Sequence, residues 1–347
     1  MDFQDKVELT QNVLKPFVSL EKIHTLDSEE HKNEHYRNKT IYSFNQEEKT
    51  STYTIIDKTH IKIIEIILEN PYFANLIKDI YIKSNVWCEN QICITFFEDN
   101  FGVKKINKII DEIISNLSEF NLASLYYRIY NDATKSKFNT KEIEQISVFK
   151  KKLCEEILGT KLYFTPYTFS RINTLVSPLI YGDVLSNSKT TLSRPNNIIL
   201  YGRDIYYLYK KFTLQTKDNL LALTHCKITY NDIITDPDLV REEIGNVKYC
   251  EKKNYTKMLK KLSNQTEEHK VILTAGRNGL SKDLLKYFLE TQNIREIVYI
   301  ACNRKSMERD LQILLVESPI FKLEKATITD EFPNTDYNNT ILYIRRI

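Results

Sequence analysis

Residues 271–303 read VILTAGRNGLSKDLLKYFLETQNIREIVYIACN, and short apolar runs alternate in them with a longer amphipathic one. Val271–Leu273 and Ile297–Ile300 have the length of buried strands, whereas Ser281–Glu290 repeats large apolar residues at helical spacing. A further helix is expected at Lys305–Leu315. Strands that alternate with helices are typical of an open, mostly parallel α/β sheet. This stretch therefore predicts the α/β fold class for the C-terminal part of the chain.

The same alternation runs from about residue 166 to the end of the chain. Further strands are expected at Ile198–Tyr201, at Leu220–Leu223, near 321–328 and near 340–346, and further helices at Ile172–Tyr181, Ile205–Phe212 and 235–244. The last two strands close the sheet, and the final one is expected to be an exposed hairpin partner.

The residues before 166 follow a different pattern. Apolar periodicity and turn signals predict helices at Ile61–Leu68, Lys104–Phe120 and 141–157 and strands at Gln91–Phe97, Leu122–Tyr130 and 161–165. The first fifty residues are polar, with one short helix expected near Gln4–Leu20. We therefore expect a polar N-terminal arm at 1–50, a mixed α+β domain at 51–165 and the α/β domain at 166–347.

The composition limits the possible functions. The chain has 347 residues, of which 42% are hydrophobic and 11% aromatic, so it can bury a sizeable core. Its 49 Lys and Arg residues nearly balance 46 Asp and Glu residues, which excludes a polybasic protein. Only 7 residues are glycine, against about 24 expected from an average usage of about 7%. Few positions therefore remain for a turn that cradles a nucleotide.

Cysteine, histidine and hydropathy patterns favour a reduced cytoplasmic protein. The six cysteines form no CxxC pair, and the six histidines have no metal-ligand spacing, so we expect no metal site and buried, reduced thiols. No apolar run approaches the about 20 residues of a membrane helix, and no secretory signal pattern is visible. We therefore expect a cytosolic or nuclear location, of which we favour the cytoplasm, and no membrane contact.

Five collinear segments resemble motifs of the RNA (uracil-5-)-methyltransferases, which make 5-methyluridine in transfer and ribosomal RNA. The similarity covers about residues 90–347. The segments are FTPYTFSRINT at 164–174, ILYGRD at 199–204, LTAGRNGL at 273–280, IVYIACN at 297–303 with Arg309-Asp310, and DEFPNT at 330–335. This resemblance implies a Rossmann-like methyltransferase domain, S-adenosylmethionine as methyl donor and RNA as substrate.

The resemblance also assigns two catalytic positions. Cys302 stands where the family has the thiolate that attacks C6 of uracil. The base that removes the C5 proton lies nine residues after the aspartate of DxFPxT, and that position is Asn339. An amide cannot accept a proton near neutral pH, so this residue could not complete the reaction. Cys302 is therefore either vestigial or a working nucleophile.

The positions implied to contact the methyl donor depart from the family pattern. Arg171 replaces a glutamine, only Gly202 remains of the glycine-rich loop, Thr224 stands where an acid would hold the ribose, and Thr274 replaces an aspartate. Several losses of this kind together cost several kcal/mol of binding, at roughly 1–3 kcal/mol each. We therefore expect no cofactor, with S-adenosylmethionine as the alternative.

Basic residues near aromatic ones are the candidates for RNA contact, because cations bind phosphate and aromatic rings stack on unpaired bases. They are Lys150, Lys151, Lys152, Arg203, Lys210, Lys211, Lys252, Lys253 and Arg277. The sequence thus favours a catalytically inactive homologue that binds transfer or ribosomal RNA, for example a dormancy or inhibitory factor on the ribosome. The alternatives are an active uracil-5 methyltransferase that uses Cys302 and a protein-binding scaffold.

Overall fold

The computed structural model describes residues 2–26, 39–45, 50–53, 57–97, 103–130, 146–147, 153–164, 171–190, 197–202, 207–209, 211–212, 219–224, 247–249, 268–333 and 335–347. These residues fall into two compact units. One unit contains Met1–Lys32, Glu156–Thr160 and Phe169–Ile347, and the other contains Asn33–Glu155 and Lys161–Thr168.

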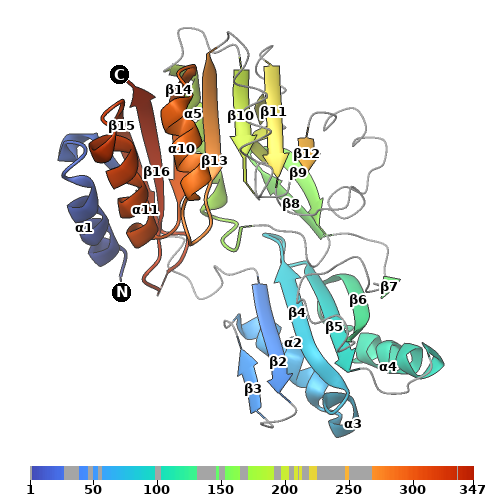
Figure 1. Ribbon diagram of the computed structural model, residues 1–347. Coiled ribbons are helices and arrows are strands. Elements are labelled where there is room, and N and C mark those ends of the chain that lie inside the picture. The colour runs from blue at the N-terminus through green and yellow to red at the C-terminus, as the bar shows by residue number, and fades with distance from the viewer. Residues whose placement is uncertain are drawn as a thin grey trace. The chain divides into compact units, whose positions relative to one another are not determined.

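An eight-stranded sheet forms the centre of the first unit, in the order β1-β15-β16-β14-β13-β10-β11-β12 (Figure 1). All pairs are parallel except those made by β16, which is antiparallel to both β14 and β15. The predicted α/β class is therefore confirmed. The strands are β1 (Ile23–Leu26), β10 (Asn197–Tyr201), β11 (Asn219–Thr224), β12 (Val247–Tyr249), β13 (His269–Thr274), β14 (Ile294–Ala301), β15 (Phe321–Thr329) and β16 (Asn339–Arg346).

Strand β16 is buried, which differs from the expectation of an exposed hairpin partner. It lies between β14 and β15, and its burial pattern is apolar on both faces over Ile341–Ile344. A continuous apolar run of this kind is what a strand with both faces covered requires. The end of the chain is thus part of the core of the sheet.

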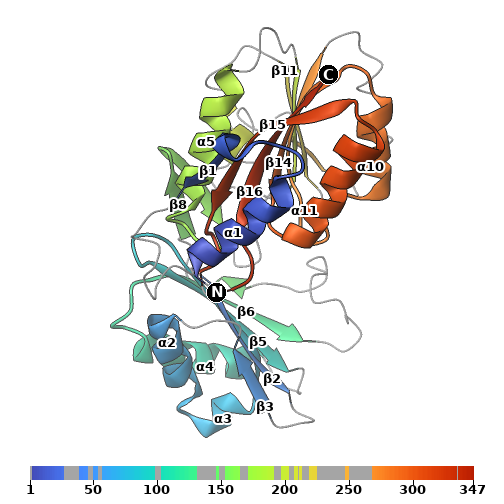
Figure 2. The same cartoon turned by 90° about the vertical axis from the view of Figure 1, so that its left-hand side faces the viewer.

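Helices cover both faces of this sheet (Figure 2). Helices α1 (Phe3–Leu14), α10 (Lys282–Glu290) and α11 (Arg304–Leu311) share one apolar cluster with β13, β14 and β16, and α5 (Ser177–Thr190) lies on the opposite face from α10 and α11. The helix predicted to reach Leu315 ends at Leu311 and continues as a π-helical turn to Glu317. The helix predicted from Ile172 begins at Ser177, because the Asn173 side chain caps the preceding turn by accepting from the backbone of Leu175 and Val176.

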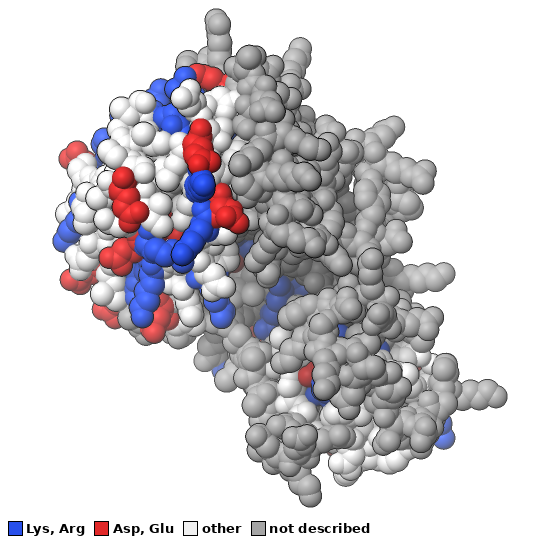
Figure 3. Space-filling model, in the orientation of Figure 1, with Lys and Arg blue, Asp and Glu red and all other residues white. Residues whose placement is uncertain are grey.

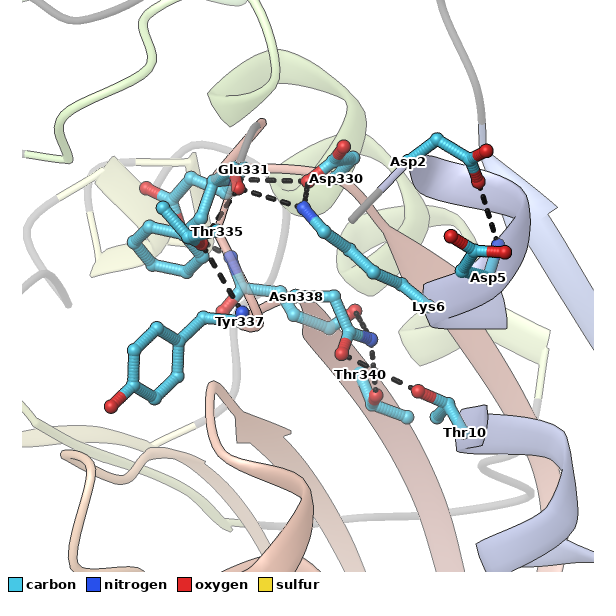
Figure 4. A network of polar contacts seen from close by, with 12 residues as sticks. Asp2, Asp5, Lys6, Thr10, Asp330, Glu331, Thr335, Tyr337, Asn338 and Thr340 are labelled. Atoms are coloured by element: carbon cyan, nitrogen blue, oxygen red, sulfur yellow. Dashed lines mark hydrogen bonds and ion pairs between the residues drawn. The ribbon is translucent and has the colours of Figure 1, made fainter. Parts of the chain in front are cut away.

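The N-terminal segment is part of this unit rather than a separate arm. Strand β1 extends the sheet by pairing with β15, and α1 packs beside it (Figure 2). The Lys6 ammonium is buried and lies 2.7 Å from both Asp330 Oδ1 and the Phe332 carbonyl oxygen, while Thr10 donates to Asn338 over 3.4 Å (Figure 4). Sequence patterning missed this packing because two of the four buried residues of α1, Lys6 and Thr10, are polar.

The second unit is an α+β domain. Its six-stranded sheet has the order β3-β2-β4-β5-β6-β7, and isoleucines of α2 and α4 pack against it in one apolar cluster. Its elements are β2 (Lys39–Asn45), β3 (Thr50–Tyr53), α2 (Lys58–Leu68), α3 (Pro71–Ala74), β4 (Ile77–Ser84), β5 (Asn90–Phe97), α4 (Val103–Asn116), β6 (Leu122–Tyr130) and β7 (Ile146–Ser147). The helices and strands predicted between Ile61 and Tyr130 are confirmed within a few residues.

The helix predicted at 141–157 is wrong over its described residues. Ile146–Ser147 and β8 (Leu153–Ile157) are strands, and β8 pairs with β9 (Thr160–Phe164) in a two-stranded sheet. Leu153, Glu155 and Ile157 alternate as buried residues, which is the period of a strand. The alternation was not recognised in the sequence because one of the buried residues, Glu155, is charged. The expected helix at 235–244 lies outside the described residues.

We predict that Lys6→Met lowers the free energy of unfolding by about 3 kcal/mol, because it leaves the carboxylate of Asp330 without its buried partner. Urea denaturation measures the loss. Lys15→Met, at the exposed end of the same helix, is the matched control and should change the free energy by less than about 0.5 kcal/mol. Equal small losses for both variants would contradict the proposed anchoring role of Lys6.

Candidate functional site

The sheet brings the two implied catalytic positions together. Ala301, the last residue of β14, pairs with Thr340 in the antiparallel ladder of β16. The next residues outward are Cys302 on one strand and Asn339 on the other. Asn339 also pairs with Thr329, the last residue of β15. The implied nucleophile and the implied base position therefore meet at one edge of the sheet, here called the Cys302 edge: Cys302, Asn339 and the residues that contact them.

A carboxylate that the sequence interpretation missed lies at this edge. Glu331 follows β15 and is buried, and its Oε2 accepts hydrogen bonds from both Arg171 Nη1, at 2.6 Å, and the side-chain amide of Asn339. The family motif places the base at position 339, so the motif did not point to Glu331. The available signal was the second residue of DEFPNT itself, eight positions earlier in the sequence.

Arg171 is held by three interactions on the buried side of the edge. Besides its ion pair with Glu331, its Nε donates to the Tyr181 hydroxyl over 3.1 Å, and its guanidinium carbon lies 5.3 Å from the centre of the Tyr181 ring. Tyr181 belongs to α5, so the helix that begins after the Asn173 cap fixes this arginine. A residue implied to contact the methyl donor is thus engaged by the protein itself.

The thiol of Cys302 is half-buried and donates a weak hydrogen bond to the Ala275 carbonyl oxygen, 3.8 Å away. Burial raises the pKa of this thiol, and the Glu331 carboxylate raises it further, while Arg171 and Arg277 act in the opposite direction. Burial and the carboxylate dominate, so the net pKa is raised. The resting group at neutral pH is therefore the protonated thiol, which is a weak nucleophile.

Arg277 and Tyr337 form the exposed rim of the edge. The Arg277 guanidinium carbon lies 5.1 Å from the centre of the Tyr337 ring, and the Asn303 side-chain amide donates to the Arg277 carbonyl oxygen over 3.0 Å. Tyr337 is in turn placed by a backbone hydrogen bond to Thr335 (Figure 4). A guanidinium stacked on an aromatic ring beside a thiol offers both a phosphate contact and a surface on which a base can stack.

Gly202 lies at the position where proteins of this fold class bind nucleosides. It follows β10. The chain passes from β10 to β11 and β12 on one side of that strand and then continues with β13 and β14 on the other side, so β10 is the switch point of the sheet. Its φ is +144°, and an added Cβ would lie 3.1 Å from both Cβ and the carbonyl oxygen of Thr274. Glycine is therefore required here by close packing of the protein on itself.

The described residues around this switch point do not fit the methyl donor. β11 and β13 both end in a threonine, Thr224 and Thr274, instead of the carboxylates that the resemblance implies. The Arg171 guanidinium already forms an ion pair with the Glu331 carboxylate. One feature favours binding of the methyl donor instead: the buried Asn173 Nδ2 has no hydrogen-bond partner among the described residues. A single neutral donor does not replace two carboxylates in holding a ribose and an ammonium group.

The predicted RNA-binding residues are placed only in part. Arg277 is exposed at the rim, and Lys211 is half-buried in a helical segment of the same unit. Lys and Arg side chains also gather over α10 and α11, where Lys282, Lys286, Lys305 and Arg309 are exposed (Figure 3). The other predicted positions lie outside the described residues, namely Lys150, Lys151, Lys152, Arg203, Lys210, Lys252 and Lys253.

The structure also bears on the expectations for the cysteines, for metal binding and for membrane-spanning helices. In the described part of the chain, Cys93 is buried, Cys154 and Cys302 are half-buried and Cys88 is exposed, so the expectation of burial is wrong for Cys88. No group of three His, Cys, Asp or Glu side chains could hold a metal ion in the described ranges. None of the helices among those residues is both long and apolar enough to cross a membrane.

The solved structures identify the class of the fold. The chain superposes on the crystal structure of a Pyrococcus abyssi tRNA (uracil-54, C5)-methyltransferase in complex with S-adenosyl-L-homocysteine, with a TM-score of 0.64. The match covers 99% of this chain and 84% of that one at 15% sequence identity. The first unit thus has the Rossmann-like fold of S-adenosylmethionine-dependent methyltransferases.

The chain is also similar in sequence to curated RNA methyltransferases. An RNA methyltransferase of Fusobacterium nucleatum is 21% identical over 299 residues, and the 23S rRNA (uracil(1939)-C(5))-methyltransferase RlmD of Aliivibrio fischeri is 23% identical over 193 residues. These matches cover 84% and 54% of this chain but only 59% and 41% of the two relatives. No protein-family model matches the chain. The chain is thus similar in sequence to RNA methyltransferases, among them a uracil-C5 enzyme, and spans about half the length of these relatives.

We predict that Cys302 is alkylated slowly at neutral pH and that its reaction rate rises with a midpoint above that of a free cysteine thiol. Removal of the carboxylate in Glu331→Gln should lower this midpoint, and removal of the cation in Arg277→Gln should raise it, because the two charges act on the thiol in opposite directions. Iodoacetamide labelling followed by peptide mass spectrometry gives the profile at this cysteine alone. Shifts of equal sign in both variants would refute the electrostatic account.

The buried pair gives a second prediction. Arg171→Gln should lower the free energy of unfolding by about 3–5 kcal/mol, because it leaves the Glu331 carboxylate buried without its cation. The double variant Arg171→Gln/Glu331→Gln should recover most of this loss, since no buried charge then remains unpaired. A double-mutant cycle in urea measures the coupling. Additive losses would show that the two side chains are not a pair in solution.

Proposed function

We propose that this chain binds RNA at the Cys302 edge and does not transfer a methyl group. The observation that carries the proposal is the buried network of Arg171, Glu331 and Asn339, in which the side chains at one implied donor-contacting position and at the implied base position both bond to Glu331. Breaking these buried bonds to admit a ligand costs free energy. Thr224 and Thr274 supply no carboxylate whose contact with the methyl donor would offset this free energy.

RNA is the partner that the retained features fit. The relatives act, by their names, on transfer or ribosomal RNA. In this chain the rim of Arg277 and Tyr337 supplies a cation and an aromatic face directly beside the thiol. Transfer RNA and ribosomal RNA remain the candidate partners. Association with the ribosome as an inhibitory or dormancy factor stays a prediction from the sequence, since it depends on residues outside this edge.

The second candidate is an active uracil-5 methyltransferase with Cys302 as nucleophile. Two observations favour it: Gly202 keeps a glycine conformation at the switch point, and Asn173 keeps an unused buried donor two residues from Arg171. In that case Gly202, Thr224 and Thr274 would line the donor site. A bound S-adenosylmethionine would supply the methyl group. The chain itself would contribute a thiol at Cys302 and a carboxylate at Glu331.

Isothermal titration with S-adenosylmethionine separates the two candidates. We predict no binding at micromolar concentrations, and no transfer of labelled methyl groups to unmodified transcripts of transfer RNA or of 23S rRNA fragments. The Pyrococcus abyssi enzyme serves as the binding-competent control. Micromolar affinity for the donor, or methyl incorporation that is lost in Cys302→Ala, would establish the second candidate instead.

RNA retention tests the remainder of the proposal. The chain should retain these transcripts on a filter at low salt, with an affinity that falls as salt rises because phosphate contacts release counterions. Arg277→Gln should weaken retention and reduce the salt dependence, whereas Arg295→Gln, an exposed cation paired with Glu268, is the matched control. Absence of retention at low salt would leave a protein-binding scaffold as the remaining function.

A further inference from the structure

We propose that exposed cations around the loop between β13 and α10 form a second contact surface, which takes the phosphates of an RNA strand whose base is held at the rim. These cations are called the loop cluster: Arg277, Lys282, Lys305 and Arg309. The inference rests on the proposed binding of RNA at the Cys302 edge and adds the surface that binds the backbone. The sequence pattern singled out only Arg277 of the four.

The fold gathers the loop cluster from two segments of the chain. Lys282 is the first residue of α10 and Lys305 the second of α11, and these helices start where the parallel strands β13 and β14 end. Gly279 allows close packing between them: its φ is +68°, and an added Cβ would lie 2.9 Å from Cβ of Ser306 in the first turn of α11. Backbone packing therefore fixes the spacing of the cluster.

Arg309 presents one side of its guanidinium to solvent. Its Nη2 donates to the carbonyl oxygens of Asn278 and Leu280, each over 3.0 Å, and its Nε donates to Asp310 Oδ1 over 3.0 Å. Asp310 is fully buried and also accepts from the backbone of Leu280 over 2.8 Å. Nη1 of Arg309 makes no hydrogen bond to the described residues, and the side chain is 50% exposed. A guanidinium fixed along one edge loses little freedom when its other edge binds a phosphate.

The two lysines of the cluster are available to an anion. Neither Lys282 nor Lys305 forms an ion pair with the described residues. The exposed acids nearest in sequence are Asp283 and Glu308, so the cations of the loop cluster outnumber them. Lys305 and Arg309 are four residues apart on α11, a rise of about 6 Å, which is close to the separation of neighbouring phosphates along a strand.

The cluster is continuous with the rim at which a base can stack. The Arg277 carbonyl oxygen accepts from the Asn303 amide over 3.0 Å, and Arg309 holds the carbonyl oxygen of the next residue, Asn278. The cation stacked on the Tyr337 ring and the cation of α11 are thus tied to consecutive residues of one turn. An RNA strand whose base stacks at the rim passes the loop cluster with its backbone.

The chemistry of this face fits phosphates better than a protein or a lipid surface. Every residue of α10 and α11 is described, and none of their large apolar side chains is exposed. A protein-docking surface usually has an apolar centre with few charges, and a membrane-surface helix needs an apolar face. Over these two helices Lys and Arg side chains gather instead (Figure 3).

The experiment measures retention of an unmodified tRNA transcript by the full chain over a series of salt concentrations. We expect Lys282→Gln/Lys305→Gln to lower the affinity at low salt about tenfold or more. The slope of log affinity against log salt should fall by about 1.4–1.8, at about 0.7–0.9 for each lost phosphate contact. Urea unfolding should be unchanged, because both lysines are exposed. Arg309 is left unaltered, since it also holds the loop.

Lys22→Gln/Lys322→Gln is the matched control, because it removes the same charge from exposed lysines at the opposite end of the strands. Lys22 directly precedes β1, and Lys322 is the second residue of β15, where it pairs with Glu324. The loop cluster lies beyond the carboxyl ends of β13 and β14. We expect the control variant to keep the affinity and the salt slope of the wild-type chain.

Lysine acetylation by an N-hydroxysuccinimide ester, followed by peptide mass spectrometry, locates the bound RNA. The transcript should protect Lys282 and Lys305 and leave Lys22 and Lys322 reactive. Polyglutamate of the same total charge, a model of an acidic protein, is tested in parallel and should protect neither pair at the same salt concentration.

The outcomes separate the two proposals. If Arg277→Gln weakens retention but Lys282→Gln/Lys305→Gln keeps the wild-type slope, the inference is overturned and the proposed function stands. Equal losses in the control variant would show an effect of net charge alone and would also overturn the inference. Equal protection by polyglutamate would assign the surface to an acidic protein instead. If the wild-type chain retains no RNA, the proposed function fails and this inference fails with it.

Discussion

The buried ion pair between Arg171 and Glu331 is the interaction on which the character of this site depends. The two residues are far apart in sequence and come from the turn before α5 and the loop after β15. Burial of two charges is costly unless they are paired, and here Tyr181 and Asn339 add further hydrogen bonds to the two partners. The pair therefore fixes the loop that carries Glu331 and at the same time occupies the arginine.

The Arg171–Glu331 pair also explains why the Cys302 thiol is protonated at neutral pH. Arg171 alone would favour ionisation of Cys302, but its charge is largely balanced by Glu331, and burial then decides the outcome. A family member that binds a sulfonium donor must keep its ligand-contacting groups available. Here Arg171 and Asn339, at a donor-contacting position and at the base position of the resemblance, both bond to Glu331.

Much of the fold followed from local patterns, and the exceptions have physical causes. Runs such as Ile297–Ile300 are apolar on both faces, so they predict central strands directly. Lys6 and Glu155 are charged but buried, so a pattern based on polarity placed α1 outside the sheet and predicted a helix where β8 forms. At the site, Cys302 and Asn339 could be paired by motif alone. Glu331 could not, because its role arises from a loop that returns to the edge in three dimensions.

A crystal structure grown with millimolar S-adenosyl-L-homocysteine tests most directly whether the protein occupies its own donor-side contacts. We predict that the Arg171 guanidinium remains on the Glu331 carboxylate and that no nucleoside is ordered beyond the end of β10. Density for the nucleoside next to Gly202, with Arg171 turned away from Glu331 toward the ligand, would contradict it.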